Sequence, residues 1–150
     1  NNLVVLRTFS KWAGLAGLRV GYGVFPKNIF KHIMRIKQPY NVNIAAQIAA
    51  LESLKDMEHL YNTVKAIISE RDRLSNKLSQ LDWLKVYPSQ ANFILCTVLN
   101  GKAKKIHREL QKRGIFVRYF DTRGLNDCLR ISVGKPEHTD VLIAALKEIC

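Results

Sequence analysis

The sequence predicts two parts of different fold class, an α/β segment followed by a small α+β layer. Residues 2–9 are a run of β-branched and apolar side chains that leads into a glycine-rich loop. A long amphipathic pattern over residues 56–81 follows two shorter helical patterns. Beyond it the order of patterns is β-β-α-β-β-α, which is typical of helices packed on one face of an antiparallel sheet.

The first part begins with two predicted strands. Residues 2–9, NLVVLRTF, are predicted to be a strand buried on both faces. Residues 18–25, LRVGYGVF, are predicted to be a second strand, in which Gly21 and Gly23 mark the close approach of a ligand or another backbone. A helix over 27–36 follows. Because two strands do not form a stable sheet by themselves, we interpret this part as a slice of a larger α/β domain.

Two further helices are predicted before the pattern changes. Pro39 disfavours helix in the residue before it, so residues 37–43, KQPYNVN, are predicted to form a loop. Residues 43–54, NIAAQIAALESL, have small side chains on several faces, which predicts a deeply buried helix. Asp56 caps the long amphipathic helix at 56–81, and the domain boundary is expected within it.

The second part is read from alternating apolar runs and one basic helical pattern. The predicted elements are strands at 84–89 and 92–99, a helix at 102–113, strands at 115–120 and 129–134, and a helix at 137–149. The lysines of the 102–113 helix are expected on a solvated face, with their stems covering apolar surface.

The charge of the chain is high and uneven. It totals +12, with +7 in residues 1–55 and +5 in residues 102–150. Such a balance indicates anionic partners, which are nucleic acid, phosphorylated small molecules or carboxylates, or else complementary acids elsewhere in a longer chain. We expect no nucleic-acid partner, because the sequence has no recognition motif of that kind. We expect no membrane partner, because no apolar run is long enough to span a bilayer.

The cysteines and histidines predict neither disulfides nor a metal site, and the N-terminal residues resemble no targeting segment. Cys96, Cys128 and Cys150 are widely spaced, which predicts buried or idle thiols in a reducing compartment rather than disulfides. No metal site is predicted, because the four histidines are scattered and no ligand spacing occurs. The chain starts without Met or a signal-like segment, so a fragment or processed form is expected.

The glycine-rich stretch TFSKWAGLAGLRVGYG at 8–23 surrounds one lysine, Lys11. An amine attacks a carbonyl only when it is unprotonated, which burial and nearby positive charge favour, and Arg19 lies close in sequence. The hydroxyls of Thr8 and Ser10, glycine N–H groups and Arg19 would together hold a phosphate. A lysine imine beside a phosphate site is what pyridoxal phosphate chemistry requires. The alternative is a surface loop in which Arg19 forms a salt bridge.

The same stretch closely resembles the lysine motif S-K-x-x-G-L-A-G-L-R-[VI]-G-[YW] of the class I and II aminotransferases, which are fold-type I pyridoxal phosphate enzymes. The resemblance implies that Lys11 forms the Schiff base and that Ser10 and Arg19 hold the cofactor phosphate. It also implies that residues 1–57 are the C-terminal part of the cofactor-binding large domain. Residues 58–150 would then be the small C-terminal α+β domain.

Other segments are similar to one subgroup of this family, the histidinol-phosphate aminotransferases, and to its plant members above all. These segments are KQPYNVN, NFIL, GIFVRYFD and CLRISVGKPEHTDVLIAAL. By this similarity Arg130 clamps the substrate α-carboxylate, Arg118 helps to receive the substrate phosphate and Asn92 lines the substrate pocket. Tyr40 also matches a motif position.

Each of these residues has a structural alternative. A charge at Arg130, within an apolar strand, is costly unless it is paired, which favours function there. Basic residues are common around Arg118, so the pattern leaves its role open. Asn92 could simply open a strand as a turn residue.

The resemblance implies a transaminase of histidine biosynthesis. It would interconvert L-histidinol phosphate and 2-oxoglutarate with imidazole acetol phosphate and L-glutamate, by way of pyridoxal 5′-phosphate on Lys11. Histidinol phosphate has no α-carboxylate, so Arg130, with Arg118, would serve a phosphate in one substrate and a carboxylate in the other. A homodimer is implied, in the plastid of a plant and otherwise in the cytoplasm. Because the family's remaining cofactor ligands lie upstream, residues 1–150 are expected to be inactive by themselves.

Three rival readings stay open. The first is another enzyme of the same fold, such as an aromatic or aspartate aminotransferase or a decarboxylase, since Lys11, Arg19 and Arg130 are compatible with many of these. The second is a nucleic-acid-binding module, which the charge alone supports. The third is a truncated, noncatalytic protein in which the fold survives for dimerisation.

Overall fold

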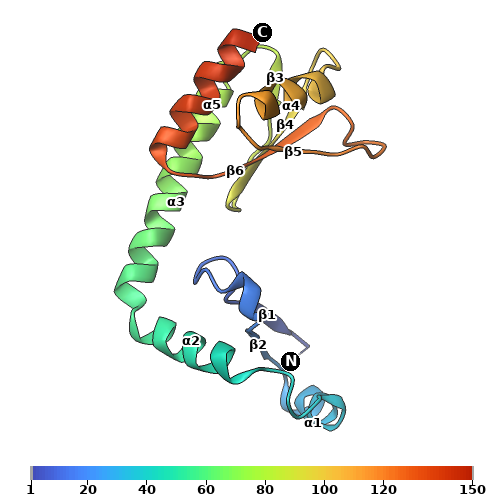
Figure 1. Ribbon diagram of the computed structural model, residues 1–150. Coiled ribbons are helices and arrows are strands. Elements are labelled where there is room, and N and C mark those ends of the chain that lie inside the picture. Colours follow the sequence, from blue (N-terminus) through green and yellow to red (C-terminus); the bar gives the residue numbers. More distant parts are fainter. Residues whose placement is uncertain (1, 150) are drawn as a thin grey trace. The chain divides into compact units, whose positions relative to one another are not determined.

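The computed structural model describes residues 2–149, which divide into two compact units between Val64 and Lys65. The division falls inside helix α3 (Met57–Leu78), the long helix that the sequence predicts at 56–81 (Figure 1). Each unit has its own sheet and its own hydrophobic core. The boundary predicted between residues 57 and 58 separates the large and small domains of a longer protein, and it stays a prediction.

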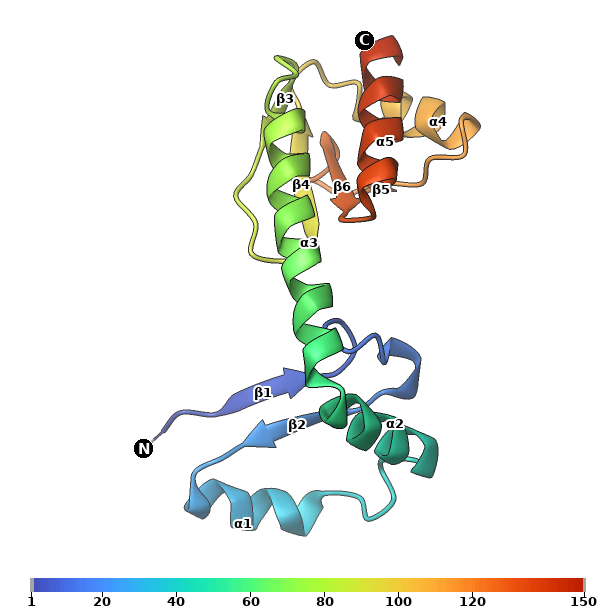
Figure 2. The ribbon, with the colours of Figure 1, turned by 90° about the vertical axis from the view of Figure 1, so that its left-hand side faces the viewer.

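The first unit is built on a two-stranded antiparallel sheet. Strand β1 (Val5–Thr8) pairs with β2 (Gly21–Val24), and a short 3-10 helix, η1 (Ala16–Leu18), lies in the loop between them. Helices α1 (Lys27–Ile36) and α2 (Ile44–Lys55) follow, as Figure 2 shows. The side chain of Asn43 caps α2, because its Oδ1 accepts a hydrogen bond of 2.8 Å from the Ala46 N–H.

Two burial predictions for this unit are wrong. The strand expected to be buried on both faces has every β1 residue exposed. The 43–54 helix expected to be deeply buried has one buried residue, Ala46, while its larger side chains such as Ile48 and Leu51 are exposed. A two-stranded sheet leaves both faces open unless other layers cover them, and residues 2–149 supply no such layer.

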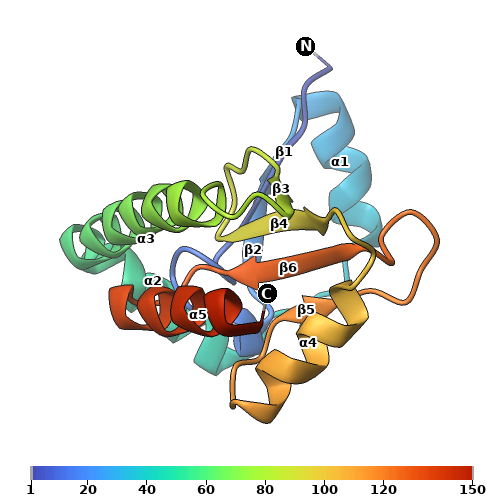
Figure 3. The same cartoon turned by 90° about the horizontal axis from the view of Figure 1, so that it is seen from above.

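The second unit confirms the predicted α+β layer. Its four strands are all antiparallel and lie in the order β3-β4-β6-β5. The elements in chain order are β3 (Leu84–Val86), β4 (Phe93–Val98), α4 (Ala103–Lys112), β5 (Arg118–Tyr119), β6 (Cys128–Ser132) and α5 (Pro136–Ile149). Helices α4 and α5 contact each other, and Figure 3 shows them beside β5 and β6.

The sheet of the second unit has an inner face packed on helices and an outer face that points away from them. Burial alternates along β4, with Ile94, Cys96 and Val98 buried. These side chains belong to one core with buried leucines of α3, α4 and α5. The alternate residues of β4 and the side chain of Arg130 in β6 therefore lie on the outer face. Burial raises the pKa of the Cys96 thiol to about 12, which fits an idle thiol.

A polar network ties α3 to the first turn of α5. Thr139 donates a hydrogen bond of 2.5 Å to Glu70, and both side chains are buried. Arg73 donates to Glu70 and to Asp140, each over 2.9 Å, and Lys77 donates to Asp140 over 2.9 Å. Burial raises the pKa of Glu70, but the hydrogen bonds from Arg73 and Thr139 outweigh it, so the pKa is lowered. The bonds from Arg73 and Lys77 lower the pKa of Asp140 to about 2.

Candidate active site

The loop between β1 and β2 carries the first group of candidate residues. Its two ends are held together because the Phe9 N–H donates to the Val20 carbonyl over 3.2 Å. The Phe9 carbonyl also accepts from the Leu15 N–H over 3.1 Å. Phe9 and Val20 are buried together with Ala46 of α2. This small core fixes the loop that presents Ser10, Lys11 and Arg19.

The turn at Ser10 and Lys11 is stabilised by its neighbours. Thr8 Oγ1 donates to Ser10 Oγ over 2.8 Å and accepts from the Ser10 N–H over 3.1 Å. Trp12 Nε1 donates to the Thr8 carbonyl over 2.7 Å, and the Trp12 ring lies 5.1 Å from the ring of Phe9. These contacts set the direction in which the chain leaves β1. The side chain of Lys11 is exposed, and no ion pair within residues 2–149 engages it.

Arg19 has an unusual backbone conformation. Its φ is 55°, and within residues 2–149 no other residue except glycine has a positive φ. This conformation costs about 1–2 kcal/mol for a residue with a Cβ, so the surrounding loop must impose it. Arg19 Nη1 donates to the Ala16 carbonyl over 3.1 Å. The described residues form no salt bridge to Arg19, in contrast to the surface-loop alternative.

Gly21 is explained by backbone packing rather than by a ligand. A Cβ at Gly21 would lie 2.5 Å from the Arg7 carbonyl oxygen of the paired strand. A Cβ at Gly23 would lie 2.4 Å from the Phe25 ring. The sequence predicted close approach of a ligand or of another backbone at both glycines. At Gly21 another backbone approaches closely, whereas at Gly23 the Phe25 side chain occupies the space where a Cβ would lie.

The donor set of this loop fits pyridoxal phosphate. A phosphate needs hydroxyl, amide and guanidinium donors, and Ser10 and Arg19 supply two of these kinds from one short loop. A carbonyl needs an amine that no ion pair engages, and Lys11 lies between them in the chain with no ion-pair partner among residues 2–149. Its side chain is exposed in residues 2–149, so the burial that would favour the unprotonated amine is not supplied by these residues. The roles of Ser10, Lys11 and Arg19 remain predictions.

The second group of candidate residues lies on the outer face of the other sheet. Arg118 of β5 and Arg130 of β6 are directly paired across the two strands. Like charges in such a pair repel each other and reduce stability. Within residues 2–149 neither arginine takes part in an ion pair. By contrast, nearby Arg113 pairs with Glu148. The arrangement suits an anion that bridges the two guanidiniums.

Arg130 is half-buried, and its Nε is a buried donor that finds no hydrogen-bond partner among residues 2–149. A buried donor left unpaired costs about 1–3 kcal/mol or more when charged, so an acceptor is missing here. The Arg130 guanidinium lies 5.2 Å from the centre of the Phe93 ring and 6.0 Å from that of Phe120. The Arg118 guanidinium lies 5.6 Å from the centre of the Phe120 ring. Sequence reasoning missed both aromatic residues, although Phe120 shares a strand face with Arg118 by its spacing of two.

The remaining predicted residues are placed less tightly. Asn92 is exposed immediately before β4, and its carbonyl accepts from the Val133 N–H over 2.9 Å. The backbone of Asn92 therefore lies beside the end of β6, the strand that carries Arg130. Tyr40 lies in the loop between α1 and α2 and is 95% exposed. The first unit thus carries Ser10, Lys11 and Arg19 on one loop, and the second pairs Arg118 with Arg130, while Asn92 lies directly before the neighbouring strand β4.

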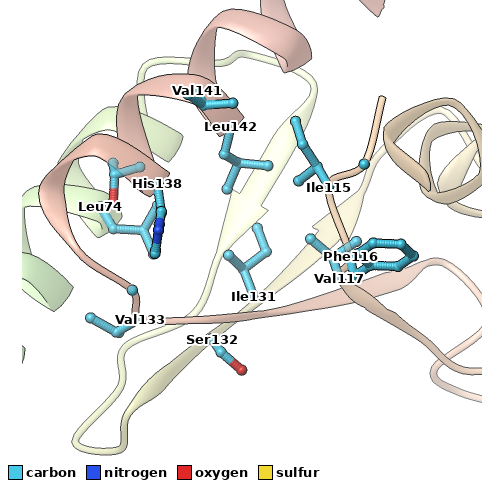
Figure 4. A pocket seen from close by; sticks show the side chains of 13 residues that line it. Leu74, Ile115, Phe116, Val117, Ile131, Ser132, Val133, His138, Val141 and Leu142 are labelled. Atoms are coloured by element: carbon cyan, nitrogen blue, oxygen red, sulfur yellow. The ribbon is translucent and has the colours of Figure 1, made fainter. Parts of the chain in front are cut away.

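A groove of about 450 Å³ in the second unit is mostly apolar. Figure 4 shows Ile115, Val117, Ile131 and Leu142 around it, with His138 from α5 on one side. The Nδ1 atom of His138 accepts from the Lys135 N–H over 3.2 Å, which caps the start of α5. The polar side chains that line the groove are Ser132, His138 and Thr139, and the Thr139 hydroxyl is engaged by Glu70.

The described part of the chain has neither a metal-binding cluster nor a membrane-spanning helix. No three His, Cys, Asp or Glu side chains within residues 2–149 gather so that they could hold a metal ion. No helix in the same range combines the length and the apolar character needed to cross a membrane. Cys96 and Cys128 are free and buried, whereas Cys150 lies outside the described residues.

Residues 1–146 match the sequence profile of the family described as "Aminotransferase class I and II". The chain therefore belongs to this family, and its two-part fold and lysine loop agree with that assignment. Among curated relatives, the histidinol-phosphate aminotransferase of Dehalococcoides mccartyi is 57% identical over 148 residues, which are 99% of this chain and 41% of the relative. The chloroplastic histidinol-phosphate aminotransferase of Nicotiana tabacum is 52% identical over 97% of this chain and 36% of its own length.

Solved structures agree with these relatives. The histidinol-phosphate aminotransferase from Sinorhizobium meliloti in complex with pyridoxal-5′-phosphate has a TM-score of 0.79 and 30% identity. The match covers 97% of this chain and 40% of that one. The L-threonine-O-3-phosphate decarboxylase from Porphyromonas gingivalis has a TM-score of 0.86 and 27% identity over 98% of this chain and 46% of its own. The chain thus spans less than half the length of the proteins that it matches.

Proposed function

We propose that the protein is a pyridoxal phosphate-dependent transaminase that exchanges an amino group between L-histidinol phosphate and 2-oxoglutarate, giving imidazole acetol phosphate and L-glutamate. The observation that carries the substrate assignment is the cross-strand pair of Arg118 and Arg130, which no carboxylate within residues 2–149 neutralises. Both substrates are anions, and relatives that are 52–57% identical bear the name of this activity.

Lys11 is proposed to hold the cofactor through its aldehyde and afterwards to carry the proton. Ser10 and Arg19 would hold the cofactor phosphate, since both lie on the loop that Phe9 and Val20 fix. When bound, pyridoxal phosphate withdraws electrons from the substrate Cα and so makes its C–H bond acidic. The Lys11 amine would then remove the proton at Cα and deliver it to C4′ of the cofactor.

The two arginines are proposed to serve both substrates at one place. A guanidinium binds a carboxylate or a phosphate through two parallel hydrogen bonds, so one arginine accepts either group. Arg130 would clamp the α-carboxylate of glutamate and 2-oxoglutarate. Because histidinol phosphate lacks this carboxylate, Arg130 together with Arg118 would receive its phosphate instead. Asn92, at the end of the same sheet, is proposed to line the pocket.

Borohydride reduction tests the covalent role of Lys11. The complete protein loaded with pyridoxal phosphate is reduced and digested, and the labelled peptide is identified by mass spectrometry. We expect the label on Lys11 in the unaltered protein and no label in Lys11→Ala. Lys27 is an exposed lysine of the same unit, so Lys27→Ala is the control and should be labelled like the unaltered protein. A label on another lysine would end the proposal. Residues 1–150 alone are expected to show a weak cofactor absorbance band and no turnover.

A substrate comparison tests the arginine pair. We expect Arg118→Ala to raise KM for histidinol phosphate by about tenfold or more, as for the loss of one charged hydrogen bond, and to change KM for glutamate much less. Arg123→Ala is the matched control, because Arg123 is an exposed arginine close by. Equal effects of Arg118→Ala on both substrates would contradict the division of roles. Preferential turnover of aromatic amino acids would favour the rival aminotransferases.

Decarboxylation is a second candidate, which the similarity to the Porphyromonas gingivalis phosphothreonine decarboxylase favours. That reaction also pairs a phosphorylated substrate with this fold. Carbon dioxide released from a phosphorylated amino acid, without transfer of nitrogen to 2-oxoglutarate, would identify it.

We also propose a homodimer as the working form. The proposed role places the protein in the plastid of a plant and otherwise in the cytoplasm.

A further inference from the structure

We propose that Phe120 is a positioning residue that holds the guanidiniums of Arg118 and Arg130 side by side for a shared anion. The inference rests on the proposed function of these two arginines. Phe120 follows β5 directly and is half-buried. Its ring centre lies 5.6 Å from the Arg118 guanidinium carbon and 6.0 Å from that of Arg130. One aromatic ring therefore contacts both members of a like-charged pair.

The pair needs such a partner because its two charges repel each other. Arg118 and Arg130 are directly opposite on neighbouring strands, which is an unfavourable placement for two cations. The negative face of an aromatic ring attracts cations electrostatically within about 6 Å. Phe120 thus offsets part of the repulsion for both arginines. Without it, the exposed Arg118 side chain would be free to turn toward water and away from Arg130.

An aromatic ring does this without occupying the hydrogen-bond donors. A carboxylate in the same place would also hold two guanidiniums, but it would accept their N–H bonds and lower the local charge. The ring leaves both charges in place, and the Nε donor of Arg130 stays without a partner. The arginines are therefore fixed and still able to donate to an incoming phosphate or carboxylate.

Phe93 does not share this role. Its ring centre lies 5.2 Å from the Arg130 guanidinium, and it contacts no second arginine within residues 2–149. Phe116 offers a matched control. It is four residues before Phe120 and 78% exposed, and none of the cation–ring contacts of the described residues involves it.

The test replaces the ring at position 120 while it keeps an apolar side chain. In the complete protein loaded with cofactor, Phe120→Leu and Phe120→Met lack the ring, whereas Phe120→Trp keeps the aromatic face. The dissociation constant of inorganic phosphate is measured by calorimetry, and KM and kcat are measured for histidinol phosphate. We expect Phe120→Leu and Phe120→Met to weaken phosphate binding and to raise KM, each by about fivefold, as for the loss of two cation–π contacts. We expect Phe120→Trp and Phe116→Leu to match the unaltered protein, with kcat unchanged in every variant.

The outcomes separate this inference from the proposed function. Equal phosphate affinity in the leucine, methionine and tryptophan variants would overturn the role of Phe120, even if histidinol phosphate is the substrate. Undetectable phosphate binding by the unaltered protein would overturn it as well. Ring-dependent phosphate affinity in a protein that does not turn over histidinol phosphate would support Phe120 and overturn the substrate assignment. A fall in kcat without a change in KM would also count against positioning, because an anion clamp acts on binding.

Discussion

Replacement of Thr139 by valine tests the network between α3 and α5. Valine has the shape of threonine but lacks the hydroxyl, so the change removes the hydrogen bond to Glu70 and leaves little empty space. Thr139 is 3% exposed and Glu70 is 7% exposed, so water does not replace the lost bond. A hydrogen bond to a charged group contributes about 1.5–3 kcal/mol. With a urea dependence of about 2 kcal/mol per molar, the unfolding midpoint of Thr139→Val is expected to fall by about 1 M.

The pH dependence of this loss gives the sharper test. The folded pKa of Glu70 is lowered, so its stabilising effect is complete above the ordinary glutamate pKa of about 4.3 and disappears as the pH falls through the folded pKa. At low pH the carboxyl is neutral, and the bond from Thr139 is an ordinary one. The difference in unfolding free energy between the unaltered protein and Thr139→Val is therefore expected to narrow as the pH falls from 7 through the folded pKa of Glu70.

The measurement is urea unfolding followed by circular dichroism at several pH values. Thr63→Val is the control, because Thr63 is an exposed threonine on α3 and its replacement should change stability by less than about 0.5 kcal/mol. The reasoning is refuted by a stability difference that stays constant from pH 7 down to the pH at which the protein unfolds in acid, or by a Thr139→Val protein as stable as the original.

Three further predictions concern packing. Gly21→Ala places a Cβ 2.5 Å from the Arg7 carbonyl oxygen, so strands β1 and β2 must separate. A lower melting temperature and weaker binding of pyridoxal phosphate, measured by absorbance, are expected, and Gly17→Ala, where a Cβ meets nothing within 4 Å, should be mild. Gly134→Ala places a Cβ 2.7 Å from His138 Nδ1, which should cost about 1 kcal/mol in urea unfolding and cost less in a His138→Ala background. Cys96, with its pKa raised to about 12, should resist iodoacetamide at pH 8 in the native protein and react in urea, as read by peptide mass spectrometry.

Much of the second unit follows from the periodicity of its sequence. The FILCTV run is predicted as a strand, but its residues are almost all apolar, so the alternation of buried and half-buried side chains along it could not be predicted from the sequence. The sequence does place Arg130 at an alternate position in an apolar strand, and its neighbours Leu129 and Ile131 are buried in the structure. The pairing of Arg118 with Arg130 could not be predicted, because register depends on how two distant strands meet.

The first unit shows where such reasoning fails. The strand at 2–9 and the helix at 43–54 have apolar sequences, and burial was predicted from them. Whether a segment is buried depends on the elements that pack against it as well as on its own sequence. Residues 2–149 leave β1 exposed. The lysine motif predicted the roles of Ser10, Lys11 and Arg19, which stay predictions, but not the left-handed backbone of Arg19. Nor did it predict that Trp12 bonds to Thr8, since both features depend on the closed loop.

The open β1–β2 ribbon has a practical consequence for anyone who purifies residues 1–150. Within residues 2–149, β1 and β2 are both edge strands, and each has a row of backbone N–H and C=O groups that no strand pairs. The exposed side chains of Leu6 and Val24 lie on these strands. Such edges allow a strand of another molecule to pair with them. Mutual repulsion among the surplus cations of residues 1–55 keeps copies apart in dilute buffer. Added salt screens that repulsion. Solutions of this polypeptide should therefore become more turbid as ionic strength rises, and the turbidity should be greatest near 1 M salt, where the screening length is about 3 Å.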